Sequence, residues 1–274
     1  METTAVANTI WFGPEHSDEG WVPAPRYLLR RARILRHMRD MPPGDIVEVG
    51  SASGALLSEF SSKGFRCTGL ETSEAAIALA RRINKAAAVK FQGQPDTAWR
   101  ECFDYCFSFE VLEHIEHDAD ALKEWAGWLR PGGAMLLSVP AHPRLWNARD
   151  VWAGHFRRYR RNELERIFAD AGFVVEKIEC YGFPLANILE LIIAPSYKKN
   201  LRKDSQGDAI INKSEQTAAS GIKRSTDVKM FGHYARAPGA WIMRAMIMVQ
   251  TLFLRVGFGN GYFVVARKPL QSRP

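Results

Sequence analysis

The chain has 274 residues, of which 46% are hydrophobic and 24% are charged, a composition typical of a soluble globular protein. This length is enough for a full core and favours one domain with an elaboration over two equal domains. The formal net charge of +7 is compatible with an anionic substrate, nucleic acid or an anionic membrane surface, but the basic residues are spread along the chain, so the charge selects none of these partners.

Residues 1–44 precede the first predicted strand. They open without the basic segment and apolar core of a signal peptide, and the four cysteines lack the Cys-x-x-Cys spacing of metal sites, which together favour a cytoplasmic protein with reduced thiols. Tyr27 to Met38 has the apolar periodicity of an amphipathic helix, and Pro42-Pro43-Gly44 ends it. We therefore expect a helical leader or cap over residues 1–44.

A strand, a tight turn and a helix start follow one another between Asp45 and Leu57. Strand-forming residues break at Gly50, and small residues continue to Gly54 before the helical pattern begins. This geometry lets a backbone approach a nucleotide-like ligand closely. Glu71 follows the second predicted strand, where a carboxylate can bind the two hydroxyls of a ribose.

Strands and helices alternate through most of the remaining chain. Such alternation implies parallel strands joined by right-handed crossovers, and therefore an α/β fold. The patterns predict strands near 45–49, 66–70, 88–91, 103–109, 134–139, 173–181 and 262–267.

Three segments carry a family resemblance: the turn of residues 50–54, Glu110-Val-Leu-Glu-His114 after the fourth strand, and Trp128-Leu-Arg-Pro-Gly-Gly133 before the fifth. In this order and spacing the chain resembles class I S-adenosylmethionine-dependent methyltransferases of the small-molecule branch. The resemblance is strong over residues 45–139 and looser over 152–182.

The resemblance implies a Rossmann-like, doubly wound, seven-stranded and mostly parallel sheet whose last strand is antiparallel, with S-adenosylmethionine as the cofactor. This methyltransferase domain would comprise residues 45–182 and 257–269. Two residues depart from the family pattern: Ala52 stands where the family has a glycine, and Gln94 stands where it typically has an aspartate. We expect Ala52 to accept the turn with a negative φ, which would hold the loop slightly further from the ligand.

The family pattern also assigns the cofactor-binding residues. Gly50 and Gly54 would supply the turn, Glu48 would order it, and Glu71 would bind the ribose. Adenine would be held by Gln94 or Asp96, with a slight preference for Gln94. The full predicted cofactor site is Glu48, Gly50, Ser51, Gly54, Glu71, Thr72, Gln94, Asp96 and Glu110.

The segment Glu110–His114 has two interpretations. It resembles the segment of ubiquinone-pathway O-methyltransferases and small-RNA 2′-O-methyltransferases in which two glutamates and the adjacent histidine bind a divalent cation such as Mg²⁺. The same residues occur in methyltransferases of this branch that use no metal, where Glu110 lines the cofactor loop and His114 packs. We favour the second interpretation and assign no metal ligand.

Three residues are candidates for the base that deprotonates the acceptor. His142 follows a strand end, and the carboxyl ends of parallel strands are where ligands bind in open α/β sheets. His155 and Tyr159 lie in the next loop. A histidine with a pKa near neutrality can take a proton from a hydroxyl or an amine. The alternative for each histidine is a structural role in its loop.

Residues 183–256 exceed what the basic fold needs. Apolar helices are expected near 184–194, a stretch too short to span a bilayer, and near 240–255. The polar segment 198–229 between them is predicted to be disordered. We expect this insertion either to roof the acceptor site, with peripheral membrane contact, or to pack on the sheet edge as a lid.

The leading hypothesis is a methyltransferase that acts on the oxygen of a small or amphiphilic, lipid-like acceptor, because histidine-rich loops suit hydroxyl deprotonation. RNA methylation is the alternative, favoured by the run Arg157–Arg161 and by Glu110–His114, although the chain has no recognisable RNA-binding appendage. A non-catalytic binding protein with this fold is a further alternative. An oxidoreductase is disfavoured because Gly50 and Gly54 do not have Gly-x-Gly-x-x-Gly spacing.

Overall fold

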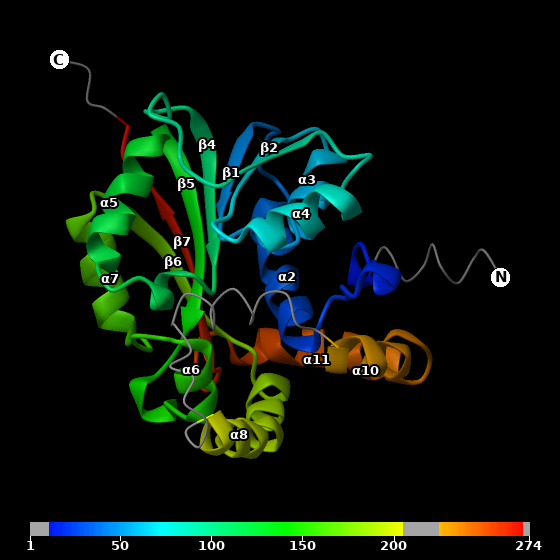
Figure 1. The fold of residues 1–274 in the computed structure, drawn as a ribbon. Coiled ribbons are helices and arrows are strands. Elements are labelled where there is room, and N and C mark those ends of the chain that lie inside the picture. Colours follow the sequence, from blue (N-terminus) through cyan, green and yellow to red (C-terminus); the bar gives the residue numbers. More distant parts are fainter. Residues whose placement is uncertain (1–10, 205–224, 271–274) are drawn as a thin grey trace.

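The computed structural model describes residues 11–204 and 225–270. Its centre is a seven-stranded sheet in the order β3-β2-β1-β4-β5-β7-β6, in which β7 is antiparallel to both of its neighbours (Figure 1). The strands are β1 (Asp45–Val49), β2 (Arg66–Leu70), β3 (Val89–Gln92), β4 (Phe103–Phe109), β5 (Leu129–Pro140), β6 (Val174–Tyr181) and β7 (Gly261–Arg267). The predicted fold class, with its antiparallel last strand, is confirmed.

Helices cover both faces of this sheet. Buried residues of α2, α3, α4 and α11 pack on one face, and those of α5 and α7 pack on the other. The helices outside the insertion are η1 (Ser17–Glu19), α2 (Pro25–Met38), α3 (Ala55–Ser61), α4 (Glu74–Ile83), η2 (Leu112–His114), α5 (Asp118–Trp128), η3 (Pro143–Leu145), α6 (Ala148–Ala153) and α7 (Arg161–Asp170).

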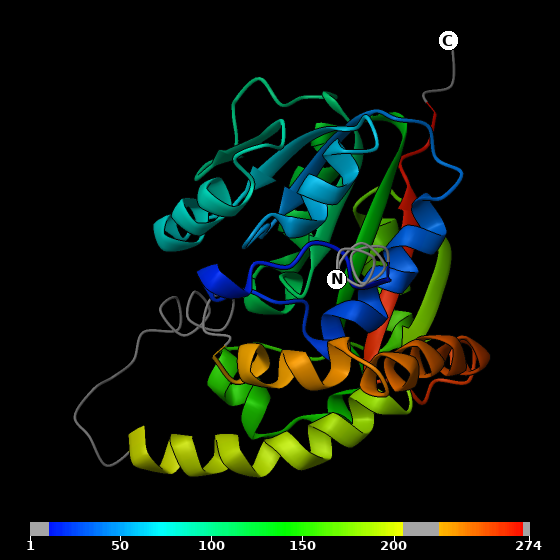
Figure 2. The ribbon, with the colours of Figure 1, turned by 90° about the vertical axis from the view of Figure 1, so that its right-hand side faces the viewer.

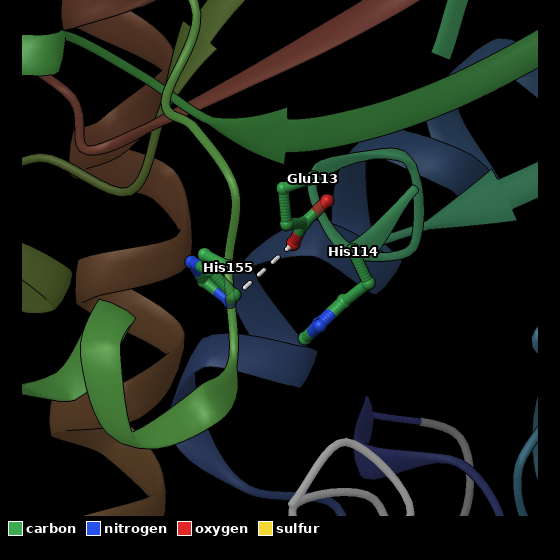
Figure 3. Close-up of side chains that lie close together, drawn as sticks. All are labelled: Glu113, His114 and His155. Carbon is green, nitrogen blue, oxygen red and sulfur yellow. Dashed lines mark ion pairs between the residues drawn. The ribbon is translucent and has the colours of Figure 1, made fainter. Parts of the chain in front are cut away.

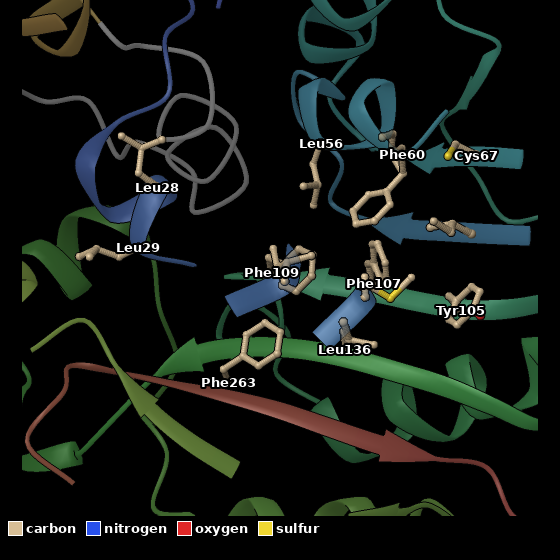
Figure 4. Close-up of a cluster of buried hydrophobic side chains, with 14 of the residues drawn as sticks. Leu28, Leu29, Leu56, Phe60, Cys67, Tyr105, Phe107, Phe109, Leu136 and Phe263 are labelled. Carbon is tan, nitrogen blue, oxygen red and sulfur yellow. The ribbon is translucent and has the colours of Figure 1, made fainter. Parts of the chain in front are cut away.

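Strand β4 shows why the central strands are apolar on both sides. Tyr105, Phe107 and Phe109 belong to the cluster under α2 and α3, whereas Cys106 belongs to the cluster on the opposite face. Successive side chains of a strand point to opposite faces, so a strand covered on both faces needs an almost continuous apolar sequence. Figure 4 shows Phe107 and Phe109 near Leu136 of the neighbouring strand β5 and Phe263 of β7.

The strand order reverses between β1 and β4. From β1 the chain proceeds outward to β2 and β3, and then returns to β4 on the other side of β1. Such a reversal leaves a crevice beyond the carboxyl ends of the two strands, where open α/β sheets bind their ligands. The turn after β1 and the segment after β4 therefore meet at the expected ligand site.

The insertion between β6 and β7 is helical. It contains α8 (Leu185–Asp204), α10 (Ser225–Ala235) and α11 (Gly239–Phe253), which gather with α6 near the end of the sheet to which β4 and β5 point (Figures 1 and 2). Both ends of the segment 198–229, expected to be disordered, are helical, and residues 205–224 lie outside the described residues. Within the described ranges, no helix combines the length and apolarity needed to cross a membrane.

Candidate active site

The turn after β1 is strained and tightly packed. The φ angles of Gly50 and Ala52 are 67° and 44°. A Cβ atom at Gly50 would lie 2.4 Å from Cγ2 of Val111, so this position requires glycine. The expected negative φ of Ala52 is wrong: its backbone N–H donates to Glu71 Oε2 over 3.0 Å, and this bond holds the residue in the left-handed region.

Glu71 joins the two loops that would hold the cofactor. Its second oxygen accepts a hydrogen bond from the N–H of Ser73 over 2.9 Å, and the N–H of Gly50 donates to the carbonyl of Leu70 over 2.8 Å. Each carboxylate oxygen has further lone pairs, so Glu71 can still accept bonds from a ribose. Its predicted position beside Gly50 is therefore observed, on the same edge of the sheet.

Glu48 and Ser51 lie buried beneath this turn. Burial raises the pKa of Glu48 to about 8, with Arg30 lowering it and Glu71 raising it. A carboxyl group with this pKa carries a proton at neutral pH and can donate a hydrogen bond. Glu48 can thus act on the loop or the ligand as a hydrogen-bond donor.

The predicted adenine-binding residues lie in an exposed turn after β3. The Oδ1 atom of Asp96 accepts a hydrogen bond from the N–H of Ala98 over 2.9 Å, so this carboxylate caps its own turn. The carbonyl oxygen of Gln94 accepts from Gln92 Nε2 over 2.6 Å, which leaves the Gln94 side chain out of that contact. The choice between Gln94 and Asp96 as the adenine-binding residue stays a prediction. Thr72, after β2, is exposed as well.

Glu110 follows β4 with a φ of 59°. Its Oε1 atom accepts hydrogen bonds from Ser138 Oγ over 2.9 Å and Tyr181 Oη over 3.1 Å, and lies 3.6 Å from a guanidinium nitrogen of Arg30. Burial raises the pKa of Glu110, but Arg30 and Arg26 outweigh this effect, so the group stays ionised. The carboxylate thus faces α2 and the ends of β5 and β6.

Three potential ligand groups converge next to Glu110. Glu113, His114 and His155 each offer one atom within 4.8 Å of the others, and Figure 3 shows their side chains around one point. Glu113 is fully buried, and neither carboxylate oxygen has a hydrogen-bond partner among the described residues. Burial, followed by the charge of Glu110, raises the pKa of Glu113 well above its usual value.

His155 is oriented by a second carboxylate. Its Nδ1 atom lies 2.9 Å from Asp150 Oδ1, while Nε2 lies 3.9 Å from Glu113 Oε1. Since an ionised carboxylate only accepts, we assign the proton to Nδ1, which leaves the Nε2 lone pair facing Glu113. Arg158 holds Asp150 in place through contacts of 2.8 and 2.9 Å. His114 beside them is neutral, since burial, then His155, lowers its pKa to about 4.

The structure does not bring His142 to this group. Its ring nitrogens lie 3.5 Å from Cys180 Sγ and 3.4 Å from Tyr262 Oη, both in the core cluster on the opposite face of the sheet from Tyr181. His142 instead lines a surface cavity of about 340 Å³ with Pro143, Arg144 and Arg160. The position of His142 after a strand end did not predict on which face of the sheet its side chain would lie.

Tyr159 has a structural position. It is buried, and its hydroxyl lies 2.9 Å from Asp118 Oδ2 and 3.3 Å from the carbonyl of Leu112. Burial, followed by Asp118, raises its pKa. A phenol with a raised pKa and a carboxylate partner is not available as a base, so Tyr159 positions η2 and with it Glu113 and His114.

Sequence reasoning missed the residues that fasten the insertion to this site. Glu190 of α8 accepts from Asn147 Nδ2 over 2.8 Å, lies 3.3 Å from Arg158 and 3.5 Å from Arg149, and pairs with Arg26 of α2. These residues are far apart in the chain and follow no local motif. Only the capping box that joins Asn147 and Asp150 at the start of α6 had a recognisable sequence pattern.

A family model described as a methyltransferase domain matches residues 24–178, more than half of the chain. The chain belongs to this family. A probable S-adenosylmethionine-dependent methyltransferase of Mycolicibacterium smegmatis is 27% identical over 48% of this chain and 52% of its own length. A ubiquinone biosynthesis O-methyltransferase of Rickettsia felis is 24% identical over 39% and 46%. The chain thus spans about half the length of these curated relatives.

Solved structures share the fold at low sequence identity. A putative methyltransferase of Bacillus halodurans superposes with a TM-score of 0.55 at 13% identity, over 88% of this chain and 99% of that one. A phosphoethanolamine N-methyltransferase of Haemonchus contortus with bound S-adenosylmethionine gives 0.55 at 17% identity, over 98% and 57%. The predicted membership of the class I S-adenosylmethionine-dependent methyltransferases is confirmed.

Proposed function

We propose that this methyltransferase transfers the methyl group of S-adenosylmethionine to a hydroxyl oxygen of a small or lipid-like acceptor. The observation that carries the proposal is the Asp150–His155 pair, which presents the Nε2 lone pair of His155 beside the segment after β4. The loops that would bind the cofactor end at the same edge of the sheet. The names of the curated relatives also favour oxygen as the acceptor atom.

Methyl transfer to a hydroxyl oxygen requires a base that removes the hydroxyl proton and a correct alignment of donor and acceptor. His155 Nε2 would take the proton of the acceptor hydroxyl as the oxygen attacks the methyl carbon, and the carbon–sulfur bond would break to leave S-adenosylhomocysteine. Asp150 would stabilise the imidazolium formed, as a carboxylate does in a hydrolase triad. Holding donor and acceptor in line contributes roughly 7–11 kcal/mol in well-oriented systems.

A divalent cation is the alternative partner for the same side chains. Two buried oxygens of Glu113 without a hydrogen-bond partner, with His114 and His155 close by, fit such an ion. A bound cation would lower the pKa of the acceptor hydroxyl. Its ligands would be Glu113, His114 and His155. We favour the mechanism without a cation, because the Asp150–His155 pair already provides a base.

The basic run Arg157–Arg161 supports an RNA acceptor less than the sequence suggested, because several of its residues form ion pairs within the protein. Arg158 is buried against Asp150, Arg157 pairs with Asp118 over 2.9 Å, and Arg160 pairs with Glu163 over 2.9 Å. Arg157 and Arg158 are thus engaged within the protein, whereas Arg160 and Arg161 keep exposed fractions of 64% and 48%. An apolar acceptor agrees with the large hydrophobic side chains that α8 and α11 expose.

Two measurements test the proposal. Calorimetry should detect S-adenosylhomocysteine with a dissociation constant on the order of micromolar, and Glu71→Ala should abolish this binding. The control Glu74→Ala removes an exposed carboxylate three residues away and should retain it. Incubation with labelled S-adenosylmethionine and a panel of phenols, catechols and their prenylated forms should then give methylated oxygen. Cofactor binding without turnover on any hydroxyl, but with turnover on amines, would refute O-methylation.

A further inference from the structure

The net charge of the protein is concentrated in the insertion. Residues 183–256 contain eleven Lys or Arg and five Asp or Glu, whereas the other 200 residues contain 26 and 25. The basic residues are spread along the chain, but the acidic residues are not, so nearly all of the +7 belongs to this segment. The spread of the basic residues along the chain therefore does not imply an even distribution of net charge.

The same segment exposes large hydrophobic side chains. Four of them have high exposed fractions: Leu191 78%, Leu252 76%, Met248 68% and Trp241 66%. Trp241, Met248 and Leu252 are spaced by seven and four residues and so share one side of α11, while Ala240, Met243 and Gln250 are buried on another. Helix α11 is thus amphipathic, with its second apolar side uncovered.

Helices α8 and α11 meet at one end. The ring of Phe183 lies 4.8 Å from that of Phe253 and 5.6 Å from that of Phe258, and Asn187 Nδ2 donates to the carbonyl of Phe258 over 3.0 Å. Phe258 is itself exposed and Asn187 is followed by exposed Ile188, so exposed hydrophobic residues of both segments lie next to this junction. These residues and the other exposed hydrophobic residues of the two helices are called the apolar face: Ile188, Leu191, Ile192, Trp241, Ile242, Met248, Leu252, Val256 and Phe258.

Exposed cations accompany the apolar face. Lys198 follows Leu191 by seven residues on α8, Arg255 follows Met248 by seven residues just past α11, and Lys229 and Arg236 are exposed on or next to α10. Among the residues of the insertion whose side chains the structure describes, no acidic residue is exposed, and Glu190 points into the network around Arg158.

We propose that the apolar face docks on the surface of a bilayer that contains anionic phospholipids. Amphipathic helices with apolar and basic residues lie in the membrane interface, and basic residues near anionic lipids strengthen the binding. A second copy of the chain fits less well, because an isologous contact through this face would place two strongly positive insertions against each other. The helices lie near the carboxyl end of β4 and β5, so docking would turn the acceptor site toward the membrane (Figure 1).

Vesicle sedimentation tests this proposal independently of methyl transfer. The full chain is mixed with vesicles of phosphatidylcholine alone or with phosphatidylglycerol, and compared with the variant Leu191→Glu/Leu252→Glu. The matched control is Val174→Glu. It changes a 57% exposed valine at the start of β6, at the end of this strand that lies away from the insertion. Binding of S-adenosylhomocysteine by each protein verifies that it is folded.

The native protein and the Val174→Glu control should sediment with phosphatidylglycerol vesicles, and high salt should weaken this binding. The partition coefficient of the double variant should fall at least about tenfold, since both apolar contact and charge complementarity are reduced. Absence of native protein from every vesicle pellet would overturn the proposal. So would vesicle binding that the double variant retains, or a dimer of the native protein that only the double variant fails to form.

Discussion

The candidate active site has two halves, a proposed cofactor side and a proposed acceptor side, which are built in different ways. On the cofactor side, Gly50, Ala52 and Glu71 are held by backbone hydrogen bonds between neighbouring loops, and the residues involved lie close together in the sequence. On the acceptor side, side-chain ion pairs join α2, α6 and α8 across long sequence separations, as Arg26 and Glu190 do. The first half therefore depends on local backbone geometry, and the second on the docking of an insertion.

The largest expected effect is on the cofactor side. Gly50→Val should abolish S-adenosylhomocysteine binding in calorimetry, because the new side chain would overlap Val111 and because φ is 67° there. A β-branched residue at positive φ costs on the order of 1–3 kcal/mol even without a clash. The control Gly127→Ala, on α5 with open space around it, should bind normally. Normal binding by Gly50→Val would show that the turn does not require glycine.

Glu190→Gln should impair the acceptor side and leave the cofactor side intact. The variant keeps its shape but loses the charge that faces Arg26, Arg149 and Arg158, so kcat/KM for the acceptor should fall about tenfold while S-adenosylhomocysteine affinity stays nearly constant. Steady-state kinetics and calorimetry on the same preparation measure both. Glu165→Gln, in an exposed pair with Arg161, is the control and should change neither. If Glu190→Gln lowered kcat/KM and the affinity for S-adenosylhomocysteine by the same factor, the two halves would be coupled.

Lowering the pH should reduce the free energy of unfolding through protonation of Asp150. Burial raises the pKa of Asp150, but hydrogen bonds from His155 and Arg158 outweigh it and lower the pKa to about 2, below its ordinary value of 3.8. A lowered carboxyl pKa stabilises the fold above the unfolded value, and this contribution disappears as the pH falls from about 4 to about 2. Glu110 and Glu179, whose pKa values are also lowered to about 2, lose stability over the same range. In denaturant unfolding the loss should therefore be about 2 kcal/mol larger for the native protein than for Asp150→Asn.

The smallest expected effects are those of a chelator and of Glu113→Gln. They test whether His155 acts as a base or as a metal ligand. A strong chelator should leave turnover unchanged, and Glu113→Gln should keep activity within about twofold, because an uncharged Glu113 resembles its amide. His155→Gln, by contrast, should be nearly inactive. If chelation stops turnover and an added divalent cation restores it, His155 is a ligand and the acceptor is activated by the ion.

The same contrast explains what could be predicted from the sequence. Gly50, Glu71 and the seven strands follow from local patterns, and the structure places them as expected. His155 was identified as a candidate, but its partner Asp150 was not, because their contact depends on how α6 ends. His142 and Tyr159 differ from His155 only in the face toward which the loop turns them, and the sequence does not encode that direction in any local pattern.

The way the insertion joins the sheet has an evolutionary consequence. The chain leaves β6 at Tyr181 and enters β7 at Gly261, and these two residues are paired neighbours in the antiparallel ladder. Everything between them is thus a long hairpin connection, and loop-closure entropy grows only slowly with its length. The part of α8 beyond Glu190 is largely exposed and could be lengthened or replaced there without shifting a strand, whereas α11 packs on the sheet through Ala240 and Met243. A lineage could therefore alter the proposed acceptor side through this connection while it inherits the turn after β1 unchanged.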